Sequence, residues 1–266
     1  MNQHHKRAEA FEKALGDALK ASGLDLPLFA FDELDSTNRF AKDLAAREVC
    51  QRALIVALSQ SAGRGRMGRT FYSPAGSGVY FSLLFPLTVA PTAALSLTAA
   101  AAVAVMRAIR KLTGKQVQIK WVNDLYLNEK KVCGILAESI LSAEGGCSYL
   151  VLGIGVNWYS AEFPDELFSI AGSVGAIGVP REALIACVTE ELLPFLEDPK
   201  DHSWLSEYRS HSAVLGKRIK WIQNDCERHG DALDIDDEGG LLVQAEDGET
   251  VLLRTGEISV RLQADQ

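Results

Sequence analysis

Apolar residues follow a helical spacing in some stretches of the chain and a strand spacing in others. Residues 11–21 repeat apolar side chains every three or four positions and stop before Gly23, which predicts a helix. A short helix is expected over residues 39–47, capped by Ser36 or Thr37, and a long one is expected from Pro91 to the residues before Gly114. Two further helices are expected over residues 181–196 and 203–209.

Strand-like segments joined by hairpin turns occupy the middle of the chain. Strands are expected over residues 53–59, 78–85, 116–121, 125–127, 132–139 and 149–156, with turns at 128–131 and 143–146. Strands and helices do not alternate regularly there. The pattern therefore favours an α+β fold, with a mixed or antiparallel sheet covered by helices.

From about Leu215 only short strands recur, over residues 216–223, 232–236, 240–246, 250–256 and 258–262. Acidic residues and glycines between them supply turns. This succession of short strands and turns predicts a small C-terminal β-barrel. We therefore expect an N-terminal extension over residues 1–27, a main domain over 28–213 and the barrel over 214–266.

Charge and cysteine content narrow the class of protein. The 266 residues carry a net charge of −8, which argues against a nucleic-acid-binding protein because such a protein needs a basic face. Five scattered cysteines without a CxxC pair favour reduced thiols in a cytoplasmic protein. The N-terminus lacks the apolar core of a signal peptide, and the apolar run 93–109 contains an arginine and hydroxyl residues, so a soluble protein without a membrane span is expected.

The segment Gly63–Arg69, GRGRMGR, is the strongest candidate for chemistry, and we call it the glycine–arginine loop. Glycine lets a backbone approach a ligand closely, and arginine offers a planar fork for phosphate or carboxylate. In the closed form of the loop, Gly65 is expected to adopt φ/ψ values that valine cannot. The loop is expected to close over an anionic ligand, although a solvated, mobile loop explains the same composition.

Two other stretches carry candidate residues. In KWVNDLYLNEKKVCGIL, Asn123, Asp124 and Lys131 surround a tight hairpin, and Gly153 and Gly155 interrupt a strand. Glycine within a strand marks close approach by a ligand or another backbone. A lysine in a turn is more commonly a solvated charge, and an aspartate there commonly stabilises the turn. Ser–His–Asp, HExxH and Walker motifs are absent from the sequence.

Taken in order, these motifs resemble those of biotin protein ligases. They are DSTN at 35–38, QSAGRGRMGR at 60–69, SPAGSGVYFS at 73–82, KWVND at 120–124, KVCGIL at 131–136, GIGVN at 153–157 and GEISVR at 256–261. The likeness spans roughly residues 29–262 and fits the short form of the family, which lacks a DNA-binding domain. It implies the biotin/lipoate ligase catalytic fold, related to class II synthetases, with an SH3-like barrel after it.

The resemblance implies an enzyme that activates biotin with ATP and Mg²⁺ as biotinyl-adenylate and then transfers it to a lysine of a biotin carboxyl carrier protein. No DNA binding is expected, and a homodimer stays possible. The implied catalytic residues are Lys131, Arg66 and Arg64, with Lys131 acting as a protonated electrostatic stabiliser. The implied biotin-binding residues are Ser36, Thr37, Asn38, Gln60, Arg64, Gly65, Arg66, Lys131, Gly134, Gly153 and Gly155. The implied ATP-binding residues are Arg66, Arg69, Phe71, Asn123, Asp124, Lys131, Asn157 and Arg261, with Asp124 also at the metal.

Two positions depart from the family pattern. Val122 replaces the usual proline of KWPND, and Met67 stands where some relatives carry a basic residue. Three alternatives remain open: a lipoate ligase or octanoyl transferase, for which Cys133 would be the candidate nucleophile, a non-catalytic sensor of the adenylate, and a generic interaction domain.

Overall fold

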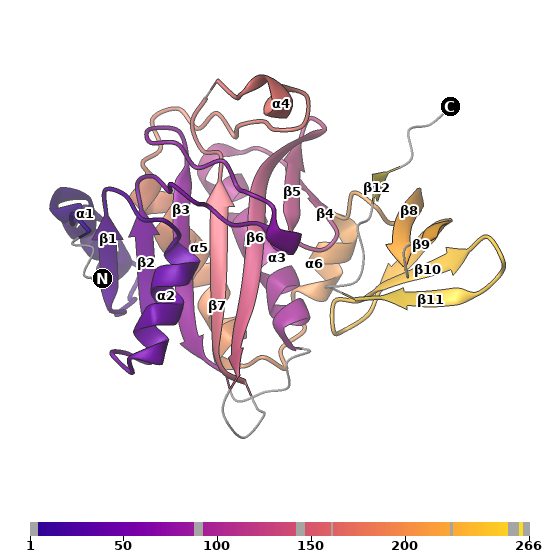
Figure 1. The fold of residues 1–266 in the computed structure, drawn as a ribbon, viewed down its shortest axis with the longest axis horizontal. Coiled ribbons are helices and arrows are strands. Elements are labelled where there is room, and N and C mark those ends of the chain that lie inside the picture. Colours follow the sequence, from indigo (N-terminus) through magenta and orange to yellow (C-terminus); the bar gives the residue numbers. More distant parts are fainter. Residues whose placement is uncertain are drawn as a thin grey trace.

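The computed structural model describes residues 5–87, 93–141, 147–160, 162–223, 226–254 and 261–262. Within them the chain forms a seven-stranded sheet with helices and, beyond it, a five-stranded sheet (Figure 1). The helices are α1 (Glu9–Ala21), α2 (Thr37–Ala46), α3 (Ala93–Thr113), α4 (Asp165–Phe168), α5 (Arg181–Glu197) and α6 (Leu205–Ser210). The larger sheet contains β1 (Leu28–Phe31), β2 (Ala53–Ala57), β3 (Val79–Pro86), β4 (Gln118–Lys120), β5 (Asp124–Leu127), β6 (Lys130–Leu141) and β7 (Cys147–Val156). The smaller sheet contains β8 (Arg218–Gln223), β9 (Cys226–Ile235), β10 (Leu241–Ala245), β11 (Thr250–Leu253) and β12 (Arg261–Leu262).

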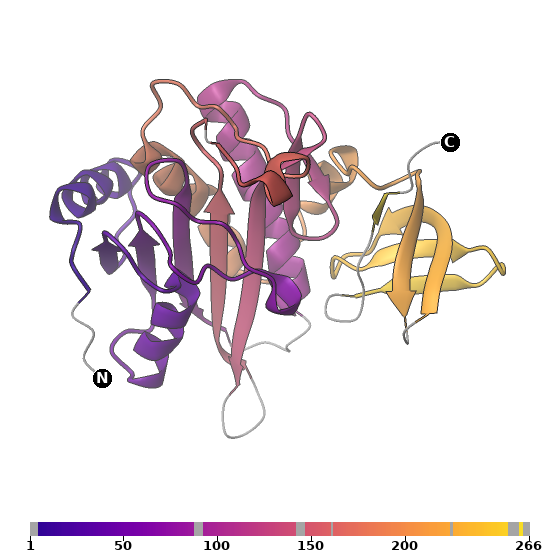
Figure 2. The same ribbon diagram turned by 45° about the horizontal axis from the view of Figure 1, so that its top comes forward.

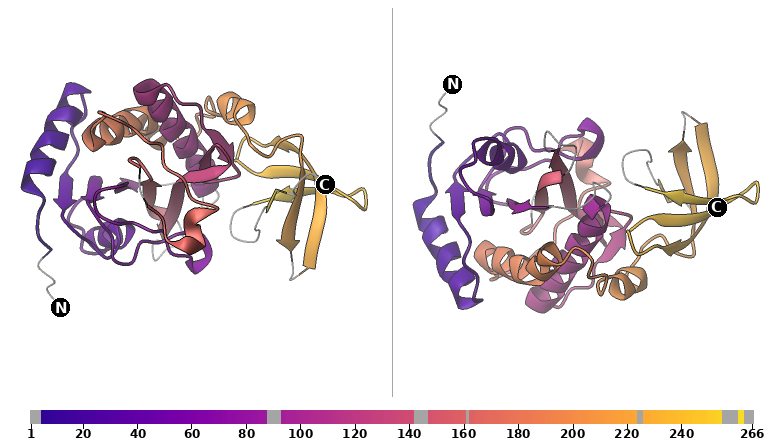
Figure 3. Two further views of the ribbon diagram at one scale, coloured as in Figure 1. Left: turned by 90° about the horizontal axis from the view of Figure 1, so that it is seen from above. Right: turned by 90° about the horizontal axis from the view of Figure 1, so that it is seen from below.

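The larger sheet has the strand order β1-β2-β3-β7-β6-β5-β4. Its β1 and β2 are parallel, and all other neighbouring strands are antiparallel. Helices α1, α5 and α3 follow one another along one side of this sheet, whereas α2 lies on the other side (Figures 2 and 3). The predicted α+β class, a mixed sheet covered by helices, is confirmed.

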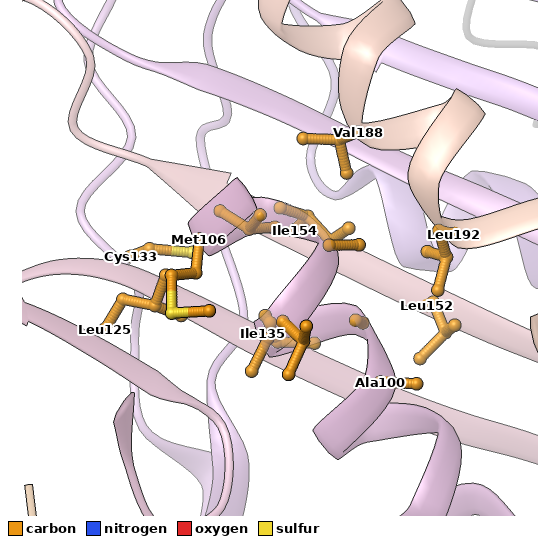
Figure 4. Packing of buried hydrophobic residues seen from close by; sticks show 14 of the residues in the cluster. Ala100, Met106, Leu125, Cys133, Ile135, Leu152, Ile154, Val188 and Leu192 are labelled. Carbon is orange, nitrogen blue, oxygen red and sulfur yellow. The ribbon is translucent and has the colours of Figure 1, made fainter. Parts of the chain in front are cut away.

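The main hydrophobic core lies between the larger sheet and helices α3 and α5. Figure 4 shows that Ala100 and Met106 of α3, Cys133 and Ile135 of β6 and Leu192 of α5 belong to it. Helix α3 is long and apolar enough to cross a membrane by length and composition. However, 78% of its apolar window is buried inside the protein, which is the environment of a core helix.

The opposite face of the sheet carries a smaller core and the site described below. Ala41 and Leu44 of α2 pack there against Ile55, Leu84 and Val151. Because side chains alternate along a strand, Gly134, Leu136 and Glu138 of β6 share this face, and Cys133 and Ile135 point to the main core.

Several element boundaries differ from expectation. Helix α2 begins two residues before the expected start, and its N-cap residue Ser36 makes no side-chain capping bond. Strand β4 is shorter than the expected 116–121, because its residues lead directly into the turn before β5. Strand β9 begins at Cys226, six residues before the expected 232–236, because its polar first half pairs with β8. The turn expected at 143–146 and residues Pro91 and Thr92 lie outside the described residues.

The smaller sheet is antiparallel, in the order β11-β10-β9-β8-β12. Side chains of the larger domain donate hydrogen bonds to backbone carbonyls of the smaller sheet and its turn. Trp121 Nε1 donates to Gly239 O at 2.8 Å, and Arg209 Nε of α6 donates to Ile235 O at 3.1 Å. The turn between β9 and β10 is thereby held against the residues that precede β5.

Candidate functional site

A cavity of about 690 Å³ opens over the face of β6 and β7 that carries their glycines. The glycine–arginine loop, the start of α2, the turn before β5 and residues 163–171 complete its wall. The cavity is lined by these residues predicted from sequence: Ser36, Thr37, Asn38, Gln60, Arg64, Gly65, Arg66, Arg69, Phe71, Asn123, Asp124, Lys131, Gly134, Gly153, Gly155 and Asn157. The backbone of Arg261 pairs with Lys220 in the smaller sheet, and its side chain lies outside the described residues.

One end of the cavity is a network of uncharged polar groups around the first turn of α2. Gln60 Oε1 accepts from the backbone N of Thr37 at 2.9 Å, and Gln60 Nε2 donates to Ser73 Oγ at 3.0 Å. Ser82 Oγ lies 2.7 Å from Thr37 Oγ1 and 2.6 Å from Asn38 Oδ1. A side chain 23 residues away thus satisfies the helix N-terminus, which is why the predicted cap by Ser36 or Thr37 is wrong.

The strand glycines make room for other side chains of the protein. A Cβ on Gly153 would lie 2.1 Å from Asn38 Oδ1, and one on Gly155 would lie 2.5 Å from the ring of Phe71. A Cβ on Gly134 would lie 3.1 Å from the same ring. The sequence argument expected these glycines to admit a ligand to the backbone, but here they admit Asn38 and Phe71, which in turn line the cavity.

The substitution Gly153→Ala is expected to destabilise the protein by about 1–3 kcal/mol, since the new methyl group overlaps Asn38. Urea unfolding measures this cost. In an Asn38→Ala background the same substitution should cost well under half as much, because the overlapping atoms are gone. Gly16→Ala in α1, where nothing lies within 4 Å of the added Cβ, is the control and should not destabilise. An equal cost of Gly153→Ala in both backgrounds would contradict the argument.

The other end of the cavity is charged. Lys131 Nζ lies 2.7 Å from Asp124 Oδ1, and Arg66 Nη1 donates to Asn123 Oδ1 at 2.9 Å. Asn123 is held in turn, because its Nδ2 donates to Ile135 O at 2.8 Å. Burial lowers the pKa of Arg66, and the nearby Asp124 carboxylate opposes that shift. Two cations and one carboxylate thus converge on one end of the cavity.

The glycine–arginine loop is folded back on itself. Gly65 N donates to Arg69 O at 2.7 Å, and Phe71 N donates to Gly63 O at 3.0 Å. Gly65 has φ −120° and ψ −179°, which is extended backbone open to any residue. The positive φ values of this loop fall instead at Met67 and Gly68, and the expectation for Gly65 in the closed loop stays a prediction. The fold turns Arg66 inward and leaves Met67 65% exposed.

The sequence argument missed one wall of the cavity, formed by Phe163, Leu167, Ile170 and Ala171. Backbone hydrogen bonds join this segment to the start of β6, since Lys131 N donates to Ile170 O at 2.9 Å and Gly172 N donates to Lys131 O at 2.9 Å. Asn157 Nδ2 also donates to Gly172 O, at 2.8 Å. Only the isolated apolar residues of FPDELFSIAG could have signalled a wall.

Trp121 and Tyr72 also line the cavity without having been predicted. Val122, the departure from the proline pattern, is fully buried, and its carbonyl accepts from the buried Tyr208 hydroxyl at 3.3 Å. Cys133 points into the main core, where burial raises the pKa of its thiol. It therefore does not face the cavity as a nucleophile would.

Comparisons with known proteins agree with this geometry. Residues 30–157 match the model of the biotin/lipoate A/B protein ligase family, and residues 214–261 match the biotin protein ligase C terminal domain. A Paracoccus denitrificans protein named biotin–[acetyl-CoA-carboxylase] ligase is 34% identical, over 82% of this chain and 94% of that protein. A Bacillus subtilis protein named bifunctional ligase/repressor BirA is 33% identical, over 91% of this chain and 77% of that protein.

Solved structures support the same assignment. The biotin protein ligase from Aquifex aeolicus in complex with biotin and ATP superposes with a TM-score of 0.72 at 30% sequence identity. The match covers 89% of this chain and 99% of that one. Fold, cavity and sequence relatives agree, and this chain belongs to the biotin protein ligase family.

Proposed function

We propose that this enzyme uses ATP to activate biotin and transfers it to one lysine of a biotin carboxyl carrier domain, with the residues of the described cavity in the roles given below. ATP-dependent activation of biotin is the activity of its family. The observation that carries the assignment of roles is that the residues lining one cavity form two bonded groups, an uncharged one around Thr37 and Gln60 and a charged one around Lys131 and Asp124. Biotin has the same division, with a ureido ring at one end and a carboxylate at the other.

The polar end is proposed to hold the ureido ring. Thr37, Asn38 and Gln60 are buried or half-buried and already hydrogen-bonded to the protein, so their orientations are set before a ligand arrives. A preorganised polar site loses less entropy on binding. Ser36 and the strand glycines Gly134, Gly153 and Gly155 complete this end of the wall.

The charged end is proposed to hold the reacting groups. A carboxylate oxygen of biotin attacks the α-phosphorus of ATP, the bond from that phosphorus to the bridging oxygen breaks, and pyrophosphate leaves. Lys131 and Arg66, which bond to Asp124 and Asn123, are proposed to face the negative charge that grows in that step, where a fixed cation would lower the barrier. In the second step the amine of the carrier lysine attacks the acyl carbon and loses a proton. The bond between that carbon and the phosphate oxygen breaks, and AMP leaves with this oxygen.

Mg²⁺ is a further proposal. It binds oxygen ligands and is usually held by one or two carboxylates together with substrate phosphates. Asp124 is the only carboxylate among the described residues that line the cavity, and its Oδ1 is buried beside Lys131 Nζ. The site fits a metal shared with ATP: Asp124 would hold the ion beside Asn123, and the ion would neutralise phosphate charge. Arg69, Phe71, Asn157 and Arg261 are proposed to contact ATP.

A cytoplasmic location and the absence of DNA binding are proposed from composition. The net charge of −8 disfavours association with nucleic acid. Cys50, Cys133, Cys187 and Cys226 are free thiols, as expected in a reducing compartment. Formation of a homodimer is a further prediction.

The test is mass spectrometry of a biotin carboxyl carrier domain incubated with the protein, ATP, Mg²⁺ and biotin, with lipoate in a parallel reaction. We expect one biotin-sized mass increase on a single lysine that depends on ATP. An increase only with lipoate would reassign the substrate. Bound adenylate without transfer would make the protein a sensor.

A further inference from the structure

Glu138 is a charged residue beside the uncharged end of the cavity. It follows Gly134 and Leu136 on the same face of β6, and 23% of its side chain is exposed. Sequence motifs did not include it, and it lies just beyond the residues that line the cavity. A carboxylate in such a place needs partners, because burying an unpaired charge is costly.

Both carboxylate oxygens of Glu138 accept hydrogen bonds from α2. Asn38 Nδ2 donates to Oε2 at 2.9 Å, and Lys42 Nζ donates to Oε1 at 2.6 Å. Arg64 Nη1 of the glycine–arginine loop lies 3.9 Å from Oε1. Burial acts to raise the pKa of Glu138, but the hydrogen bonds from Lys42 and Asn38 outweigh it, so the pKa lies below its usual value. Glu138 is therefore an acceptor without a proton at neutral pH.

This acceptor sets the direction of a chain of hydrogen bonds. Because Asn38 Nδ2 donates to Glu138 and, at 3.3 Å, to the backbone carbonyl of Leu136, its Oδ1 faces Ser82, which can only donate to it. The single proton of Ser82 is then committed to Asn38, so Thr37 must direct its own hydroxyl proton to Ser82 Oγ at 2.7 Å or to Gln60 Oε1 at 3.3 Å. Thr37 Oγ1 is left with acceptor capacity only, at the wall of the cavity.

We propose that Glu138, held by Lys42, is a positioning residue that sets the donor–acceptor pattern which the cavity presents to biotin's ureido ring. The inference rests on the proposed role of the polar end. It predicts that Glu138 governs biotin affinity and leaves the charged end unaffected, since its hydrogen-bonded partners lie in α2 and its remaining neighbour Arg64 is 51% exposed.

The test is calorimetric biotin binding and steady-state kinetics of Glu138→Gln. A glutamine cannot accept from both Asn38 and Lys42 without turning its own amide donor toward one of them. We expect at least tenfold weaker biotin binding, a KM for ATP within twofold of wild type, and a small change in Tm. Desthiobiotin, which keeps the ureido group and lacks the sulfur, should lose affinity by the same factor.

A control variant separates positioning from general stabilisation. Glu191→Gln is the control, because Glu191 is similarly exposed, pairs with Arg107 and lies on α5 across the sheet, and it should bind biotin normally.

Wild-type biotin affinity in Glu138→Gln, or an equal loss for biotin and ATP, would each overturn the inference. Failure of the wild-type protein to bind biotin would instead overturn the proposed function, so the two failures are distinguishable.

Discussion

Lys131→Met is expected to slow formation of biotinyl-adenylate by roughly 100- to 1,000-fold, the loss typical when one preorganised charge-stabilising group is removed. Lys131 Nζ lies 2.7 Å from Asp124 at the charged end of the cavity, where Arg66 also bonds to Asn123. Methionine keeps the length of the side chain and removes the charge. The fold should survive, because Lys131 is bonded to the segment after α4 through its backbone.

Single-turnover pyrophosphate release at saturating biotin and ATP measures the effect of Lys131→Met. Lys111→Met is the control, because Lys111 is 59% exposed on α3 and pairs with Glu190 away from the cavity. Lys111→Met should match the wild type. A rate for Lys131→Met within threefold of the wild type would remove Lys131 from the catalytic residues.

Arg66→Ala is expected to release the adenylate roughly 10- to 100-fold faster, the equivalent of losing a hydrogen bond to a charged group. The guanidinium of Arg66 is half-buried and directed by its bond to Asn123, so little reorganisation separates it from a phosphate in the cavity. Arg64 and Arg69 of the same loop are more exposed and cannot replace it without refolding the loop.

Trapping of released adenylate by dilution into excess unlabelled biotin and ATP measures its lifetime. Arg52→Ala is the control, because Arg52 lies over Phe85 and pairs with Glu197 outside the cavity. An unchanged lifetime in Arg66→Ala would show that the loop closes without this arginine. A changed lifetime in Arg52→Ala would point to an indirect effect of stability.

The octanoyl transferase alternative loses its candidate nucleophile in the folded protein. Cys133 alternates with Gly134 along β6, and this alternation directs its thiol into the main core. The relatives named biotin ligases favour the same conclusion. Cys133 follows Lys131 closely in the sequence, but the strand directs its thiol to the face opposite the cavity.

Local patterns in the sequence were sufficient to predict the fold class and the order of the main elements, and the resemblance to biotin protein ligases predicted most of the residues that line the cavity. Hydrophobic periods located the helices and strands, because burial of one face imposes that period. The glycine–arginine loop and the strand glycines were visible because their composition is locally unusual, and both line the cavity. The boundaries of β4 and β9 were missed, since pairing with a neighbouring strand decides where a polar strand begins.

The way in which the side chains at the site work together could be seen only in the folded chain. Asn38 and Glu138 are 100 residues apart, and no local pattern shows that one fixes the amide of the other. Position 153 requires glycine because the side chain of Asn38 occupies the space that a Cβ would need. The N-terminus of α2 is hydrogen-bonded by Gln60 and not by its own cap residue. The wall at residues 163–171 exists because its backbone bonds to Lys131. Hydrogen-bond direction and close packing depend on atoms that the chain brings together only when it folds.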